Sequence, residues 1–174
     1  MFKWLKKVFG KKEEVKKETP KVEVPKVEPK VEEAQPKVEG TPWMDIAYKE
    51  MGISEVSGSK HNERILEYHS ATELKATDDE TPWCSSFVSW CLEQAGIKST
   101  KNAWARSYLK WGKAINKPVP GCIAVFSRGK GSGHVAFFVK DNGLSISCLG
   151  GNQGNKVCIA SYPKARLLGY RMPV

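Results

Sequence analysis

The chain has 174 residues, a formal net charge of +9 at pH 7 and five cysteines. This length allows one domain with a full hydrophobic core and an additional segment. The positive charge favours an anionic polymer as partner, but the sequence has no recognisable nucleic-acid-binding motif, so we expect no nucleic acid partner. The cysteines lack metal-type spacing and the three histidines stand singly, which argues against zinc and favours reduced thiols. We expect no metal and no cofactor.

Residues 1–12 separate into two faces on a helical wheel. The segment is too short and too basic for a secretory signal, and too short to span a bilayer. As a helix it would be cationic and amphipathic and would bind an anionic membrane surface; the alternative is a frayed basic tail. The apolar face has Phe2, Trp4, Leu5, Val8 and Phe9, and the basic face includes Lys3, Lys6 and Lys7.

Residues 13–40 repeat Lys-Val-Glu and proline themes. Regular proline disfavours a helix, and this composition cannot bury enough apolar surface to fold. We therefore expect a flexible, semi-extended linker that holds the domain of residues 41–174 away from the basic tip.

The first half of that domain has helical patterns at residues 41–51, 62–70, 81–95 and 102–111. In the third of these, Thr81 is predicted to be the N-cap and Pro82 the first helical residue. Cys84 then lies in the first turn, where free backbone N–H groups and the helix dipole lower the pKa of a thiol. The alternative is that Cys84 is a small buried apolar residue.

The second half of the domain has the patterns of strands. Strands are predicted at residues 122–126, 134–140, 144–149, 156–162 and 167–171, and Asp-Asn-Gly at residues 141–143 predicts a hairpin. Helices followed by a meander of strands indicate an α+β fold, with the N-terminal helices packed on an antiparallel sheet of about five strands.

His134 opens one of these strands, directly after a glycine-rich run. The apolar residues that follow anchor it to the core, and a general base needs such rigid placement. If Asp141 faces Leu144, His134 lies opposite Gly151, and a shift of one residue would bring Asn152 alongside the imidazole. Asn152 would then accept the imidazole N–H and orient the ring; the alternative is an ordinary turn residue.

The chain contains the segments WCSSFV at residues 83–88, PGCIAVF at 120–126 and GHVA at 133–136. In this order they resemble the nucleophile helix, a core strand and the histidine strand of the NlpC-type and CHAP superfamily of cell-wall cysteine hydrolases. The TPWC, GHV and LGGNQG motifs are similar to those of a small phage and bacterial branch. The resemblance implies a papain-like fold, Cys84 as nucleophile, His134 as base, and peptide or amide bonds of peptidoglycan as substrate.

Some residues depart from the pattern of that superfamily. Trp83 replaces an Asp that often precedes the nucleophile and helps to hold a substrate amine. Substrate contacts are therefore expected from Trp83, Tyr68, Asp79 or Glu80, of which the last three fit capping or core roles equally well. The identity of the third catalytic residue and of the cleaved bond stays open.

The expected function is an endolysin-like peptidoglycan hydrolase with a Cys–His thiol mechanism, acting as a monomer. We expect it to be made in the cytoplasm without a signal peptide and to act at the bacterial cell wall or periplasm, in association with membrane through residues 1–12. Two alternatives remain: a non-catalytic, membrane-tethered module that binds the cell wall, and a papain-like acyltransferase or deamidase with another substrate.

Overall fold

The computed structural model describes residues 40–174. The predicted membrane-binding helix of residues 1–12 and all but the last residue of the predicted linker lie outside the described residues. Within the described part, no helix is both long and apolar enough to cross a membrane.

Three short α-helices come first in the described part of the chain. They are α1 (Pro42–Lys49), α2 (Glu63–Ser70) and α3 (Cys84–Gln94), followed by the 3₁₀ helix η1 (Ala105–Lys110). The predicted start of α3 is wrong by two residues. Thr81 is not its N-cap, because the Thr81 backbone N–H and hydroxyl both donate to the Asp78 carboxylate, and Trp83 takes the cap position.

The strands form one sheet with the order β1-β6-β2-β3-β4-β5, and every pair in it is antiparallel. Five of the strands were predicted, and the short edge strand β1 was not. The strands are β1 (Lys113–Ile115), β2 (Ile123–Ser127), β3 (Gly133–Asp141), β4 (Ser145–Gly150), β5 (Cys158–Pro163) and β6 (Leu167–Met172), with a 3₁₀ turn η2 (Lys164–Arg166) before β6. The predicted α+β class is confirmed.

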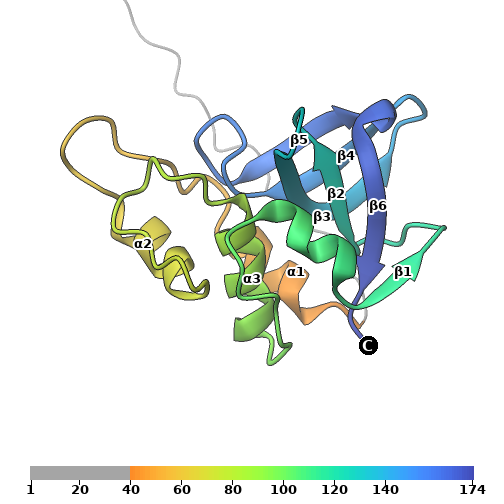
Figure 1. Ribbon diagram of the computed structural model, residues 1–174, viewed down its shortest axis with the longest axis horizontal. Helices are drawn as coiled ribbons and strands as arrows, with labels where there is room; N and C mark the ends of the chain where they lie inside the picture. The colour runs from red at the N-terminus through yellow and green to blue at the C-terminus, as the bar shows by residue number, and fades with distance from the viewer. Residues whose placement is uncertain (1–39) are drawn as a thin grey trace, which may run out of the picture. The chain divides into compact units, whose positions relative to one another are not determined.

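The sheet buries both of its faces. Val135 and Phe137 of β3 belong to the apolar cluster shared with the helices, whereas Ala136 and Phe138 belong to a second cluster on the opposite face. This alternation follows from the period of two residues in a strand. Figure 1 shows the helices beside one side of the sheet, with α3 next to β3. The core therefore fixes β3, and His134 with it.

The hairpin between β3 and β4 has a different register from the predicted one. Asp141 pairs with Ile146, not with Leu144, and a β-bulge lies between Phe138 and Lys140. A bulge adds one residue to one strand, so register changes along the ladder. With this register, a continued ladder would place residue 152 opposite His134.

Candidate functional site: a thiol and an imidazole at the end of a sheet

Cys84 is the first residue of α3, and its thiol is almost fully buried, with 5% of the residue exposed. Burial raises the pKa of this thiol, although the Val135 backbone N–H and the Arg128 charge act in the opposite direction. The predicted lowering of the pKa is therefore wrong for this state, because the loss of solvation exceeds the effect of the helix N-terminus. At rest, Cys84 is a neutral thiol.

The Cys84 sulfur lies at the peptide bond that joins His134 to Val135. The Val135 backbone N–H makes a hydrogen bond to the sulfur that favours its ionised form. The ladder between β3 and β4 reaches only Phe137 on this side, and α3 packs against β3. The nucleophile candidate and the base candidate therefore meet at one end of the sheet.

His134 is fully buried, and its two ring nitrogens have different surroundings. Nε2 lies 3.0 Å from the side-chain oxygen Oε1 of Gln153 and 3.0 Å from the Tyr162 hydroxyl. Nδ1 is buried without a hydrogen-bond partner in the described part of the chain. Burial, followed by the positive charge of Arg128, lowers the pKa of His134 to about 3, while the Gln153 hydrogen bond raises it. At neutral pH the ring is uncharged.

The hydrogen bonds of Gln153 decide which nitrogen of His134 carries the proton. The Gln153 side-chain N–H groups donate to the backbone carbonyls of Cys148 and Cys158, so its Oε1 atom faces the ring and must accept. The Tyr162 hydroxyl donates to the same oxygen at 2.9 Å. Nε2 of His134 therefore carries the hydrogen, and Nδ1 presents a lone pair, as a general base requires.

The orienting residue is Gln153, whereas the sequence pointed to Asn152. With the observed register, an extension of β4 would place Asn152 opposite His134, but β4 ends at Gly150. The chain then turns: Asn152 has a positive φ of 54°, and the next side chain folds back onto the imidazole. Gly151 fits beneath this turn because a Cβ there would lie 2.4 Å from the Trp83 ring.

The other predicted substrate residues do not meet at the thiol. Tyr68 is fully buried, and its hydroxyl donates to Glu50 at 2.6 Å. The buried carboxylate of Asp79 accepts the backbone N–H groups of Val56 and Asn62, so it holds a loop together. Both positions serve as structural supports.

Trp83 and Glu80 also differ from the expectation. Trp83 is fully buried, its indole N–H donates to Glu55 at 2.8 Å, and its ring lies next to Gly151. Glu80 is exposed and makes no ion pair within residues 40–174. Sequence analysis did not identify Gln153, Tyr162 and Arg128, since nothing in the local pattern shows that the fold brings them to His134.

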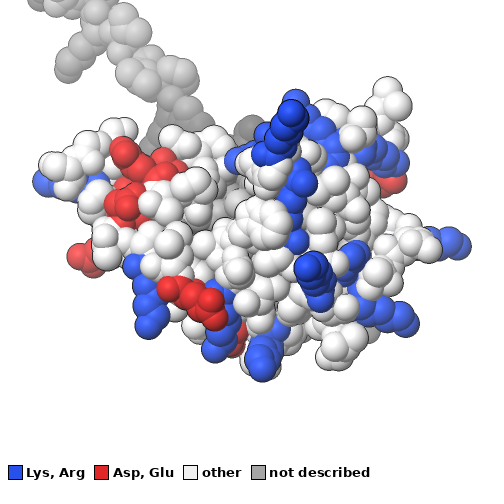
Figure 2. Space-filling model, viewed as in Figure 1, with Lys and Arg blue, Asp and Glu red and all other residues white. Residues whose placement is uncertain are grey.

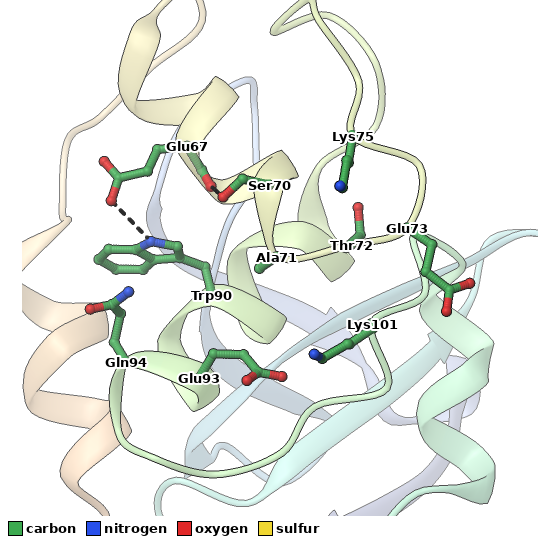
Figure 3. Close-up of a pocket in the computed structure, with 10 residues that line it drawn as sticks. All are labelled: Glu67, Ser70, Ala71, Thr72, Glu73, Lys75, Trp90, Glu93, Gln94 and Lys101. Carbon is green, nitrogen blue, oxygen red and sulfur yellow. Dashed lines mark hydrogen bonds between the residues drawn. The ribbon is translucent and has the colours of Figure 1, made fainter.

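A separate pocket of about 450 Å³ lies at the other end of α3. Figure 3 shows that Trp90, Glu93 and Gln94 of this helix line the pocket together with Glu67 of α2, and Trp90 donates its indole N–H to the Glu67 carboxylate. Positions 84 and 90–94 lie at opposite ends of the helix, so this pocket does not contain the thiol. Within the described residues, no cluster of His, Cys, Asp and Glu could hold a metal ion.

The chain is similar to a known family of protein domains. The CHAP domain family matches residues 76–152, a stretch that includes Cys84 and His134 and ends one residue before Gln153. The predicted resemblance to the NlpC-type and CHAP superfamily is thus confirmed. CHAP domains are typically cysteine- and histidine-dependent amidohydrolases or peptidases that act on peptidoglycan.

The chain is also similar to a lipoprotein-like protein of the NLP/P60 family from Staphylococcus aureus, known from a crystal structure. The two share 18% identity with a TM-score of 0.45, and the match covers 77% of this chain and 41% of that protein. The chain therefore spans less than half the length of this solved relative. No protein among curated sequences matches the chain significantly.

Proposed function

We propose that this protein hydrolyses a peptide or amide bond of peptidoglycan, with Cys84 as the nucleophile and His134 as the base. The observation that supports the proposal most is the buried imidazole whose Nε2 is held by Gln153 while Nδ1 has no partner. A buried polar nitrogen without a partner is costly in a stable core. It is expected where a proton must be accepted.

The proposed reaction begins with a neutral thiol and a neutral imidazole. Nδ1 of His134 takes the thiol proton while the Cys84 sulfur attacks the carbonyl carbon, and backbone N–H groups at the start of α3 stabilise the oxyanion. The imidazolium then gives its proton to the leaving amine, and a thioester forms on Cys84. Water attacks the thioester and gives a proton to Nδ1; the C–S bond then breaks, a carboxylic acid is released, and the imidazolium returns the proton to the Cys84 sulfur, which restores the thiol and the neutral imidazole.

The buried resting state is compatible with this reaction. A separated charge pair at this site is disfavoured by burial, but the thiolate and the imidazolium attract each other strongly where the effective dielectric is low. Gln153 supports the imidazolium through its oxygen. The Val135 N–H supports the thiolate. Both contacts stabilise the charged states of the reaction, and the Gln153 contact also fixes the tautomer of the resting imidazole.

The test is the clearing of purified cell walls by the full chain and by matched variants. C84A and H134A should lose activity by about a thousandfold or more, because such residues act as a unit. C91A removes another buried thiol of α3, and H61A removes a histidine distant in the chain; both should keep near-native rates. Equal clearing by wild type and C84A would overturn the proposal.

We also propose that residues 1–12 bind an anionic membrane and bring the enzyme to its wall substrate. The alternation of Phe2, Trp4 and Leu5 with lysines supports this, since such segments bind anionic lipid surfaces. Deletion of residues 1–12 should leave the hydrolysis of naked walls unchanged and reduce the lysis of intact cells. Deletion of residues 13–24 is a control of equal length. Equal lysis of intact cells by both deletion variants and wild type would contradict the membrane role.

A further inference from the structure

A second cavity lies on the side of the sheet where His134 begins β3. Its volume is about 520 Å³, and it is lined by Ser127, Arg128, Gly129, Ala165 and Arg166. It is formed by the loop between β2 and β3 and by the η2 turn. Figure 2 shows basic side chains spread widely over the part of the molecule that contains the sheet.

Both walls of this cavity are close neighbours of the proposed catalytic residues. In the β2–β3 ladder, Phe126 pairs with His134, so the loop that carries Arg128 starts two residues beyond that pair. On the other wall, η2 begins two residues after Tyr162, whose hydroxyl contacts His134. The rings of Phe126 and Tyr162 stack at 4.8 Å between centroids. The strands that lead into the two walls therefore contact each other directly.

The cavity is positively charged, and within residues 40–174 its arginines form no ion pair with an acidic side chain. The ion pairs of the described residues are those of His61, Arg64 and Lys164 with carboxylates. Neither Arg128 nor Arg166 takes part in one, and both are exposed. A guanidinium group binds a carboxylate through two parallel hydrogen bonds, which a lysine cannot reproduce. Two such groups on facing walls are suited to one anionic group.

The side chains of Trp104 and Arg106 hold the loop that carries Arg128 in place. Arg106 donates to the backbone carbonyls of Gly129 and Ser132, and Trp104 donates to that of Gly131. These bonds fix the backbone while the Arg128 side chain stays exposed. A fixed loop lowers the entropy cost of binding a ligand.

We propose that this cavity is a specificity subsite in which Arg128 and Arg166 bind a free carboxylate of the substrate peptide, beside the bond to be cleaved. The proposal rests on the hydrolase function proposed above and narrows its substrate to acidic peptides. A carboxamide at the same position would gain only neutral hydrogen bonds, so the site distinguishes the free acid from its amide.

The test uses two synthetic peptides of the wall stem type, identical except for a carboxylate or a carboxamide beside the scissile bond. Wild type should cleave the carboxylate peptide with the higher kcat/KM. R166Q should lower that value about tenfold to a hundredfold, mainly through KM, and leave the carboxamide peptide nearly unaffected. R128Q should also lower it, but the Arg128 charge acts on Cys84 and His134, so for this variant the expected result is a smaller ratio of carboxylate to carboxamide cleavage. K113Q removes an exposed positive charge from the distant strand β1 and should change neither. Equal cleavage of both peptides by wild type would overturn the subsite alone.

A binding measurement separates failure of the subsite from failure of the hydrolase function. Calorimetric titration of C84A with each peptide needs no turnover. Tighter binding of the carboxylate peptide, lost in C84A/R128Q, supports the subsite even if wild type proves inactive on walls. Equal binding of both peptides to C84A would overturn it, whether or not walls are cleaved.

Discussion

Replacement of Gln153 by alanine should weaken the orientation of the proposed base, His134, while the imidazole itself stays in place. The change deletes the oxygen that accepts the Nε2–H of His134 and both donors to the carbonyls of Cys148 and Cys158. Each buried acceptor left without a partner costs about 1–3 kcal/mol. The hydroxyl of Tyr162 remains 3.0 Å from Nε2, so it can replace part of the lost contact. We therefore expect a loss in kcat of about tenfold to a hundredfold, smaller than the full effect of a general base.

The assay compares Q153A with N152A on purified walls, together with the free energy of unfolding of each variant in urea. N152A should keep near-native kcat, because the hydrogen bonds to the His134 ring come from Gln153 and Tyr162 and not from Asn152. The double variant Q153A/Y162F should lose more activity than Q153A alone, since both contacts to Nε2 are then gone. Equal losses for N152A and Q153A, or full activity of Q153A, would refute the assignment.

Two further predictions concern stability. The pKa of His134 is about 3 in the folded protein and about 6.5 in an unfolded chain. Between these pH values the unfolded state therefore binds the proton more readily than the folded state. The free energy of unfolding should fall as pH decreases from about 6.5 towards 3, by up to roughly 1.4 kcal/mol per pH unit from this group. In urea titrations at pH 4 to 7, the free energy of unfolding of H134Q should change less with pH than that of wild type. An identical pH dependence in wild type and H134Q would contradict the assignment of His134 as a buried, neutral imidazole. Y68F should lose about 2 kcal/mol of stability, because the Tyr68 hydroxyl donates to a buried carboxylate of Glu50, yet should keep kcat and KM; a large KM change would restore Tyr68 as a substrate contact.

Local sequence signals were sufficient for the elements and for the two main site candidates. The period of the apolar residues identified α3 and β3, and with them Cys84 and His134, which the structure brings to one end of the sheet. The missed strand β1 has only three residues and a mostly exposed pattern, so it carries no apolar signal. The start of α3 was misplaced because the side chain of Asp78 competes for Thr81.

The rest of the site depends on long-range geometry that local patterns do not contain. The bulge after Phe138 changes the hairpin register, and the turn after Gly150 exchanges Asn152 for Gln153 at the imidazole. The pKa of Cys84 was misjudged for a similar reason. Its position at a helix start is visible in the sequence, but the burial that opposes ionisation arises from packing against β3.

The most direct measurement is the digestion of purified peptidoglycan in water enriched in oxygen-18, followed by mass spectrometry of the released fragments. Hydrolysis through a Cys84 thioester should give new carboxyl groups that each carry one label from water, paired with new free amines. C84A should give neither product, and the mass of the cleaved fragments should identify the bond. Labelled fragments produced at the same rate by C84A, or intact walls after treatment with wild type, would contradict the proposed function.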